Sequence, residues 1–319
     1  MDTRAFDVVV VGELNIDLIL NQLHQFPQIG KEILADQMTF TLGSSSAIFA
    51  SNLRMLGSRV SFVGKLGNDM FGHHILSELK RRDLHTEDLI FSEQSHTGIT
   101  VALNDGEDRA MVTYPGAMND LYVEEISEKA LKKGGHLHVS SVFLQKALKK
   151  DITRLFEKAR SFGMTTSLDP QWDPEEKWDI DWGDLLPYVD LFLPNAEEAK
   201  SIQQTDDLVE AGQQLLLYAP AVVIKDGSNG AHLFRHNQHL HQKAFLSSHV
   251  EDAIGAGDSF DAGVIHKFIH RHSWQEALEF GALTGAVNTT RAGGTGAFQS
   301  KPLFREIAEQ QFHFPLGDF

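Results

Sequence analysis

Short apolar runs alternate with amphipathic stretches along most of the chain. Residues 6–11 are almost entirely apolar, as in a strand that is buried on both faces of a sheet. Similar short runs predict further strands at 60–63, 136–140, 165–168, 190–193 and 221–224. Helical spacing predicts helices at 44–56, 70–82, 151–162 and 206–218. This alternation predicts an α/β fold, with a mostly parallel sheet and helices on both of its faces.

Two segments depart from this alternation. Residues 31–42 alternate between apolar and polar positions without a helical stretch, and residues 97–114 have a hairpin pattern with a turn at 104–108. Together they predict a small β-sheet that projects from the main body. Such a sheet could be a lid over a site at the carboxyl ends of the parallel strands, or an apolar patch for dimerisation. One sheet can serve both purposes, so both interpretations stay open.

Composition narrows the function classes. The 319 residues suggest about two domains or one large α/β unit. The chain has 44 acidic and 28 basic residues, and the resulting net charge of −16 argues against binding to nucleic acid or to an anionic membrane surface. The net charge does not exclude a single basic pocket that binds a small phosphate. The absence of cysteine excludes disulfides, thiolate catalysis and cysteine–zinc sites. No secretory signal or membrane-spanning run is evident, so we expect a cytoplasmic protein.

The strongest candidate for chemistry lies at the expected start of a helix over 259–271. Gly255, Ala256 and Gly257 would leave their backbone N–H groups open there, and with the helix dipole these groups form an anion site. Asp258 would lie in the first turn beside that site. A carboxylate repels a bound phosphate, but it can accept a proton from a hydroxyl that attacks the phosphorus. The alternative is that Asp258 only caps the helix.

Other phosphate-binding motifs are missing from the sequence. The Walker A pattern G-x-x-x-x-G-K-[ST] does not occur. The dinucleotide pattern G-x-G-x-x-G begins at Gly255 and Gly257, but Phe260 occupies the position of its third glycine. The anion site is therefore of a different kind.

Two further segments follow predicted strands. Asn195 and Glu198 lie three residues apart after the strand at 190–193, and could hold water-bound Mg²⁺ against phosphates. The alternative is that Asn195 caps a helix. Lys225 ends the next strand and precedes a turn with Gly227 and Gly230, so it could reach a nucleotide phosphate while glycine allows close backbone approach. The alternative is an ordinary hairpin turn.

Polar side chains also follow the first strand. Asn15 and Asp17 would share one side of an extended segment, where they could form hydrogen bonds with adjacent hydroxyl groups of a ligand. The alternative is that they serve local turn formation.

These segments together resemble the ribokinase/PfkB family of carbohydrate kinases over nearly the whole chain. The segment 252–258 has the pattern D-x-x-G-A-G-D, which is the family signature and the most specific match. Asn195-x-x-Glu198 matches N-x-x-E, and 64–72 matches G-x-x-G-x-D-x-x-G. Residues 12–32, 114–117 and 167–170 are also similar to family segments.

The resemblance implies a fold and a set of roles. It implies one ribokinase-like domain over residues 1–319, a three-layer α/β/α arrangement with a small β-sheet lid from about 14–42 and 97–115. ATP and Mg²⁺ are the implied cofactors, and a homodimer through the lid is the implied assembly. Asp258 would be the catalytic base, beside an anion hole formed by Gly255, Ala256 and Gly257. The other roles are the following: Asn195 and Glu198 for Mg²⁺–ATP; Lys225, Gly227, Gly230 and Asn288 for the nucleotide; Asn15, Asp17, Gly43 and Ser44 for the substrate; Asp252 and the Ile254 carbonyl for a monovalent cation such as K⁺.

The sequence departs from the family on the substrate side. The family motif G-G-x-x-x-N begins here at Gly43 with Ser44 as its second residue, and ends at Ile48, which cannot form the hydrogen bond of the asparagine. The segment that corresponds to the family motif D-P-N-x-R is D-P-Q-W-D at 169–173. Asp173 therefore occupies the position of the arginine, which could pair with an anionic substrate group. Ala253 replaces a threonine of the signature, which is a milder change.

The resulting expectation is an ATP-dependent kinase that phosphorylates a hydroxymethyl group of a sugar or sugar-like alcohol, with Asp258 as general base. Two alternatives stay open. The first is a nucleoside kinase, because Ile48 could favour a partly apolar ligand. The second is a catalytically weak sugar-sensing protein on the same fold. The residues that would select the acceptor are the ones that differ from the family motifs, so the sequence does not identify the acceptor.

Overall fold

The computed structural model describes residues 4–23, 25–105, 108–236, 238–247 and 250–317. In this part of the chain the main sheet has eight strands in the order β14-β13-β12-β11-β10-β9-β1-β4. Neighbouring strands from β12 to β4 are parallel, and β13 and β14 extend the sheet antiparallel. The bounds are β1 Phe6–Val11, β4 Val60–Val63, β9 Gly134–Ser140, β10 Thr165–Asp169, β11 Leu191–Phe192, β12 Val222–Lys225, β13 Ala231–Arg235 and β14 Gln238–Gln242.

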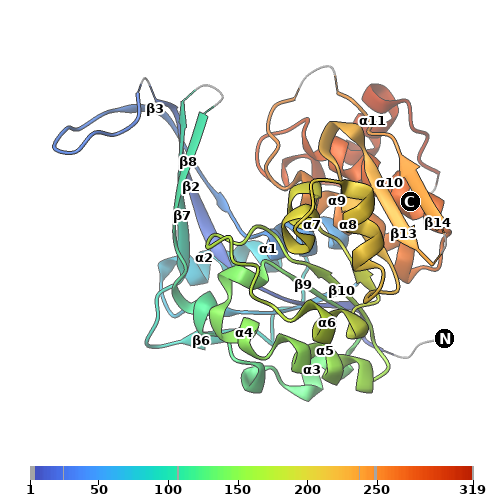
Figure 1. Ribbon diagram of the computed structural model, residues 1–319. Coiled ribbons are helices and arrows are strands. Elements are labelled where there is room, and N and C mark those ends of the chain that lie inside the picture. The colour runs from blue at the N-terminus through green and yellow to red at the C-terminus, as the bar shows by residue number, and fades with distance from the viewer. Residues whose placement is uncertain (1–3, 24, 106–107, 237, 248–249, 318–319) are drawn as a thin grey trace.

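Helices cover both faces of this sheet (Figure 1). One face packs against α1 Ser45–Met55, α2 Met70–Arg81, α9 Ala256–Ile269, α10 Trp274–Asn288 and α11 Lys301–Phe312. The other packs against α3 Glu128–Lys132, α4 Lys146–Lys150, α5 Ile152–Ser161, α6 Trp182–Leu185, α7 Ala196–Gln203 and α8 Leu208–Leu215. Because side chains alternate along a strand, Val8 and Val10 of β1 enter the first core and Val9 and Val11 enter the second. The apolar run therefore belongs to a strand buried on both faces, as predicted.

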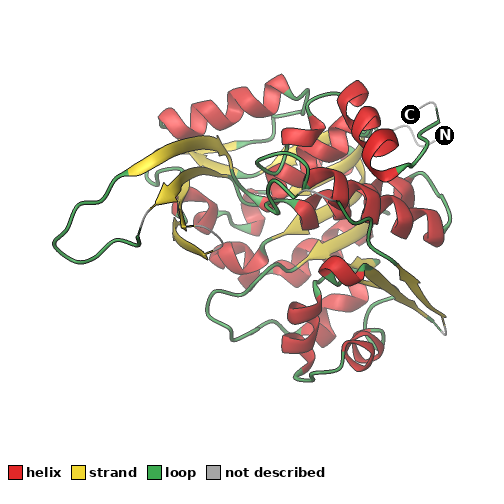
Figure 2. Cartoon of the chain, turned by 90° about the horizontal axis from the view of Figure 1, so that it is seen from above, coloured by secondary structure: helices red, strands yellow, loops and turns green. Residues whose placement is uncertain are grey.

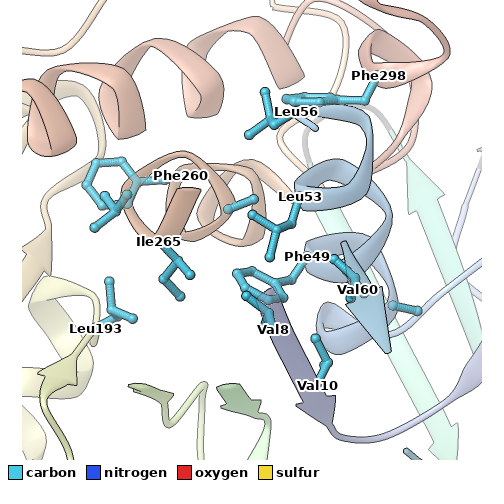
Figure 3. Packing of buried hydrophobic residues seen from close by; sticks show 14 of the residues in the cluster. Val8, Val10, Phe49, Leu53, Leu56, Val60, Leu193, Phe260, Ile265 and Phe298 are labelled. Carbon is cyan, nitrogen blue, oxygen red and sulfur yellow. The ribbon is translucent and has the colours of Figure 1, made fainter. Parts of the chain in front are cut away.

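The first core fixes the two helices that carry the site. Phe49 and Leu53 of α1 pack beside Phe260 and Ile265 of α9, above the side chain of Val8 (Figure 3). All of these side chains are buried. The amino ends of α1 and α9 are thus held in a fixed relation by apolar packing.

A second, smaller sheet stands away from this body (Figures 1 and 2). Its order is β3-β2-β7-β8, with β2 parallel to β7 and the other pairs antiparallel. The bounds are β2 Asn15–Leu23, β3 Ala35–Leu42, β7 Gly98–Asp105 and β8 Asp108–Tyr114. The Phe40 ring of β3 contacts the rings of Phe71 and His74 on α2, with centroids 6.1 Å and 5.0 Å apart. The predicted hairpin over 97–114 is confirmed, but residues 106 and 107 of its turn lie outside the described residues. The strands β5 Lys65–Gly67 and β6 Ile90–Ser92 form a separate two-stranded sheet.

The structure changes several predicted bounds. The helix expected over 259–271 begins at Ala256, because Gly255 serves as its N-cap with a φ of 74°. The polar segment after β1 does not belong to that strand, since Asn15 and Asp17 open β2 of the small sheet. The pattern did not single out α10, which is buried along several sides and so lacks a one-sided apolar stripe. Among the described residues, no helix combines the length and apolar character that crossing a membrane would need.

Candidate active site

The candidate site lies where parallel strands end and α9 begins. Asp169 is the last residue of β10, Lys225 is the last of β12, and Asn195 follows β11. A β-bridge pairs Asn195 with Lys225, so these strand ends are direct neighbours. The carboxyl ends of parallel strands meet at one edge of a sheet, which explains why residues so far apart in the sequence converge here.

Asp258 is the third residue of α9 and is 6% exposed. Its Oδ1 accepts a hydrogen bond from Nε2 of Gln171 at 3.0 Å. The N-cap of α9 is Gly255, and no side chain caps the helix there. The structure therefore does not use Asp258 as a cap, which was the alternative interpretation of this residue.

The pKa of Asp258 is raised to about 7, mainly by burial and also by the nearby carboxylate of Asp169, while the charge of Lys225 opposes both effects. Desolvation disfavours the charged form of a carboxyl group, and a second negative charge does the same. A group with a pKa close to neutrality can both accept and release a proton at working pH. Asp258 thus has the burial and the proton affinity of a general base.

A buried network connects Asp258 to the end of β12. The same Gln171 amide group donates to Asp169 Oδ2 at 2.8 Å. Lys225 Nζ lies 2.8 Å from Asp169 Oδ2 and 2.9 Å from Asp261 Oδ2. Burial alone would lower the pKa of Lys225, but these two carboxylates keep it above its usual value. Lys225 is therefore a charged group, held at the edge of the sheet by ion pairs.

The segment before α9 requires glycine at position 255. Gly255 has a φ of 74°, in the left-handed region that favours glycine. A Cβ atom there would lie 2.6 Å from Cα of Gly294 and 3.0 Å from Cγ2 of Ile48. The loop therefore passes between these two residues with no space for a side chain. The amide of Ala256 donates to the Ala253 carbonyl at 3.2 Å, which closes the turn that leads into α9.

A cavity of about 380 Å³ opens beside this helix start. Lys225, Gly227, Gly230, Ala256 and Gly257 line it, so five of the residues predicted for phosphate or nucleotide binding share one space. Much of the remaining lining is apolar, from the following residues: Ala244, Phe245, Leu246, Val250, Ala253, Phe260, Ala282 and Ala286. Its volume lies within the range of small-ligand sites.

Asn288 does not line this cavity. It is fully buried, and its Nδ2 donates to the Ile254 carbonyl at 2.6 Å. Its Oδ1 accepts from the Ser259 hydroxyl at 3.0 Å. Asn288 therefore supports the loop that precedes α9 through buried hydrogen bonds. The sequence predicted a contact with the nucleotide for this residue, whereas its side chain is engaged in that loop.

Asn195 and Glu198 form a capping box at the start of α7. Asn195 Oδ1 accepts from the Glu198 amide at 2.9 Å, and Glu198 Oε2 accepts from the Asn195 amide at 2.8 Å. Burial raises the pKa of Glu198 to about 8, with a further contribution from Asp169. The capping interpretation thus holds, and it leaves a buried carboxylate at the edge of the sheet.

The residues around Glu198 fit a magnesium ion held mainly through water. Glu198, Asp169 and Asp261 place three carboxylates near Lys225, and Asp261 Oδ1 is buried without a hydrogen-bond partner among the described residues. No group of three or more His, Asp or Glu side chains in the described segments is arranged to hold a metal directly. Mg²⁺ commonly uses few protein ligands and several waters, so the excess of carboxylates suits it.

The residues predicted for a monovalent cation are engaged in backbone contacts. Asp252 Oδ1 accepts from the Ile254 amide and Oδ2 from the Gly293 amide, both at 2.9 Å. The Ile254 carbonyl accepts from Asn288. Each of these oxygens can accept a further contact. A K⁺ site at Asp252 and Ile254 stays a prediction.

The residues predicted for the substrate gather at the base of the small sheet. Asn15 Nδ2 donates to Asp17 Oδ1 at 3.0 Å and to Thr100 Oγ1 at 2.9 Å. The amide of Gly43 donates to the Asn15 carbonyl at 3.1 Å, and a side chain at Gly43 would overlap the Asp17 carboxylate. Asn15, Asp17 and Gly43 therefore form one polar group, and none of them lines the cavity beside α9.

Ser44 and Ile48 have structural roles at the start of α1. Ser44 caps the helix by accepting from the Ala47 amide at 3.0 Å, and its hydroxyl donates to the Glu13 carbonyl at 2.6 Å. Ile48 is 3% exposed, and a side chain at Gly294 would overlap its own. The Ile48 side chain is thus packed against the loop that precedes α9.

Sequence reasoning missed three polar residues of the site: Asp169, Gln171 and Asp261. Asp261 could have been found, because it lies three residues after Asp258 and thus on the same side of a helix. Asp169 ends a predicted strand, which is a weaker signal. Gln171 has a left-handed φ of 56°, and its bridge between two aspartates depends on that tertiary arrangement.

Comparison with known proteins agrees with this geometry. Residues 5–301 match the pfkB family carbohydrate kinase. A 5-dehydro-2-deoxygluconokinase 1 from Bacillus cereus is 25% identical, over 97% of this chain and 97% of its own. A 2-dehydro-3-deoxygluconokinase from Bacillus subtilis is 27% identical, over 90% of this chain and 93% of its own. The solved structure of Arabidopsis thaliana ribokinase, complexed with ribose and ATP, has a TM-score of 0.79 at 22% identity, covering 91% of this chain and 94% of its own.

The chain therefore belongs to the pfkB family of carbohydrate kinases. It is a phosphotransferase that acts on a sugar hydroxyl group. The predicted ribokinase-like fold is confirmed, with its large, mostly parallel sheet, its smaller sheet and its helices on both sides.

Proposed function

We propose that this protein transfers the γ-phosphoryl group of ATP to a hydroxymethyl group of an uncharged sugar or sugar-like alcohol, with Asp258 as the general base. One observation carries the proposal. Asp258 is buried at the start of α9 with a pKa raised to about 7, and the neighbouring residues Ala256 and Gly257 line a cavity large enough for a nucleotide moiety. A proton acceptor beside an anion site is what attack of a hydroxyl group on a phosphoryl group requires.

The proton moves from the acceptor hydroxyl to the carboxylate of Asp258 as the new oxygen–phosphorus bond forms. The Gln171 amide group holds that carboxylate in place through its 3.0 Å hydrogen bond. Because Gln171 also binds Asp169, its orientation is fixed by a second contact. Asp258 releases the proton to solvent after the product leaves, which its pKa near neutrality permits.

The transferring phosphoryl group is stabilised by the start of α9. The Gly257 amide and the positive end of the helix dipole would interact with the charge that develops on its oxygens. The Ala256 amide, which the sequence predicted to be open, donates to the Ala253 carbonyl instead, and Gly255 does not line the cavity. Lys225 lines the same cavity, so its charge would attract the donor phosphates. When bound near Asn195 and Glu198, Mg²⁺ supplies neutralisation of phosphate charge.

The acceptor binds on the side of the small sheet in this proposal. Asn15 and Asp17 would form hydrogen bonds with its hydroxyl groups, and Gly43 leaves space beside Asp17. We propose that residues 14–42 and 97–115 form a lid on a single domain. Closing it would exclude water, which otherwise competes with the sugar as the phosphoryl acceptor.

The environment of residue 173 supports an uncharged acceptor. The two relatives named above are kinases of gluconate derivatives, whose substrates carry a carboxylate. Asp173 is 3% exposed and accepts from the amides of Glu175, Lys177 and Trp178 at 2.8–2.9 Å. Asp173 therefore holds this loop, and it supplies no positive charge that could pair with an acidic substrate.

The position of Ile48 does not favour a nucleoside as the acceptor. Its side chain packs against Gly255 and Gly294 and is 3% exposed, so it offers little apolar surface to a base. A sensor without activity would have no use for a buried base beside an anion site. The sugar kinase is therefore the function that these contacts support best.

We also propose that two copies associate through the small sheet. Met38, Phe40, Met111, Val112 and Tyr114 of its edge strands β3 and β8 are 40–69% exposed. Exposed apolar groups of this number are more typical of an interface than of a surface in water. Replacing Val112 by aspartate should convert a dimer to a monomer in light scattering, whereas a monomeric wild type would contradict the assembly.

ADP release across a panel of acceptors tests the function. The panel contains pentoses, hexoses and their ketoses, 5-dehydro-2-deoxygluconate, 2-dehydro-3-deoxygluconate and nucleosides. We expect turnover on at least one neutral sugar and less on the two acids. Turnover on a nucleoside alone would support the nucleoside kinase, and thermal stabilisation by a sugar without any ADP release would support the sensor.

A further inference from the structure

A separate polar cavity lies where the small sheet meets the main body. Its volume is about 260 Å³. It is lined by Thr41 of β3, by Arg81 and Arg82 at the end of α2, and by residues 292–299 of the loop that leads to the 3₁₀ turn Gly296–Phe298. It shares no lining residue with the cavity beside α9. Nothing in the proposed kinase reaction uses it.

Arg82 is an incompletely paired cation in this cavity. Its side chain is 12% exposed, and its Nη2 donates to Thr295 Oγ1 at 2.9 Å. Its Nε is buried without an acceptor among the described residues. The carboxylate nearest to it, Glu78 Oε2, is 3.8 Å away. Leaving a buried guanidinium N–H group without an acceptor costs stability, so an anion would be favoured here.

Glu78 compensates for Arg82 only in part, because its ion pair with Arg82 is long, at 3.8 Å. Both oxygens of Glu78 accept from Arg81, at 2.7 Å and 3.2 Å. Burial and the charge of Arg81 lower the pKa of Arg82, and the charge of Glu78 opposes this shift without reversing it. This is the direction expected for a buried cation whose counter-charge is shared with a neighbour.

The other elements around the cavity add no negative charge. From β3 the lining residues are Phe40, Thr41 and Leu42, and from the loop they are Ala292, Gly293, Thr295, Gly296 and Gln299. From α2 only Glu78 is acidic, against Arg81, Arg82 and the titratable His74. Cations in a last helical turn often complement the helix dipole. That effect accounts for the exposed Arg81, but not for a buried Nε without an acceptor.

We propose that this cavity is a binding site for a small phosphate-bearing anion, either inorganic phosphate or a phosphate monoester of a few carbons. The guanidinium groups of Arg81 and Arg82 would supply the charge-assisted hydrogen bonds, and the hydroxyl of Thr41 a further donor. The volume far exceeds the ~30 Å³ share of one water molecule, so a phosphate group and several more atoms fit.

The position of the cavity gives such a ligand a structural effect. Gly293 lines it, and the Gly293 amide donates to Asp252 Oδ2 at 2.9 Å. The next residue, Gly294, packs against Gly255 and Ile48. An anion between Thr41, Arg82 and Gly293 would therefore connect β3 to the loop that supports the start of α9.

Thermal unfolding of the full chain tests the proposal. A non-hydrolysable ATP analogue with Mg²⁺ first saturates the cavity beside α9. Inorganic phosphate or glycerol 3-phosphate is then titrated against sodium chloride of equal ionic strength. At ten times its Kd, the bound anion should raise the Tm of the wild type by about 2 °C or more. Preference for one of the two probes identifies free phosphate or a monoester as the ligand.

Three variants locate the effect. Arg82→Met should abolish the phosphate-dependent rise in Tm. Arg81→Met should weaken phosphate binding at least fivefold, and folds more safely because Arg81 is 55% exposed in its side chain. Lys80→Met is the matched control on the same helix and should respond as the wild type, since Lys80 does not line the cavity. The absence of any phosphate-dependent rise in wild-type Tm, or an equal rise in wild type and Arg81→Met, would overturn the proposal.

Hydrogen exchange gives a second readout. Bound phosphate should slow exchange of the amides in β3 and in the loop 292–296 in the wild type, less in Arg81→Met at the same phosphate concentration, and not in Arg82→Met. Protection confined to residues 225–230 and 255–258 would place the anion beside α9 and would contradict the proposed site.

Discussion

The two sides of the candidate active site are built differently. On the side of α9, buried polar groups hold one another: Gln171 joins Asp258 to Asp169, and Lys225 joins Asp169 to Asp261. On the side of α1, Ser44 and Ile48 stand where the family resemblance leads one to expect glycine and asparagine, and both serve local structure. In the proposed reaction, phosphoryl transfer and acceptor choice would therefore depend on separate sets of residues. The first set can match a family while the second departs from it.

The largest expected effect comes from the α9 side. Replacing Asp258 with asparagine should lower kcat about a thousandfold, because the acceptor hydroxyl loses its proton acceptor. Nucleotide binding should persist, since the asparagine still accepts a hydrogen bond from Gln171 and the cavity keeps its lining. Steady-state kinetics and calorimetric titration of an ATP analogue measure the two quantities. A variant that keeps wild-type turnover would disprove the role of Asp258.

Alanine substitution should affect stability very differently at two glycines of the same segment. Gly255→Ala should lower the free energy of unfolding by about 2–4 kcal/mol, since alanine must adopt a φ of 74° and lie against Gly294. At Gly257 a Cβ atom would only reach ordinary contact with Lys225, at 3.9 Å, so Gly257→Ala should change stability by less than about 1 kcal/mol. Urea unfolding of both variants measures the difference. Equal losses would show that the loop is less tightly enclosed than the contacts indicate.

On the α1 side, residue 48 should affect stability more than it affects acceptor binding. Ile48→Asn should cost about 2 kcal/mol, because the amide enters an apolar contact with Gly255 and Gly294. The control Ile48→Val should cost about 1 kcal/mol. Unfolding curves and the KM for the best acceptor separate the two roles. If Ile48→Asn stays stable and gains activity on ribose, residue 48 contacts the acceptor and the comparison fails.

The smallest expected effect is that of pH. The base must be ionised to accept a proton, and burial raises the pKa of Asp258 to about 7. The value of kcat/KM should therefore rise about tenfold between pH 6 and pH 8 and level off above that. The residual activity of Asp258→Asn should lack this rise. A wild-type profile that is flat across the range would show that the free enzyme's base has an ordinary carboxyl pKa.

The sequence predicted the parallel strands of the main sheet well because they are short apolar runs, whose pattern depends on burial alone, but it did not predict the antiparallel strands β13 and β14. It also placed Gly257 and Lys225 at one cavity, since strand ends and a helix start follow from local pattern, whereas Gly255 does not line that cavity. It could not show that Gln171 would adopt a left-handed conformation and join two aspartates. Nor could it show that Ile48 packs against a loop more than 200 residues away in the sequence. Contacts of this kind depend on how separate elements meet.

The enclosure of Gly255 between Ile48 and Gly294 constrains any redesign of this protein for new acceptors. A library that varies position 48 alone should give mostly unstable variants, because a larger side chain would overlap the backbone of Gly255 and Gly294 and a polar one would lose the apolar contact there. Pairwise diversification of positions 48 and 294, with 255 kept as glycine, samples the shapes that the backbone can tolerate.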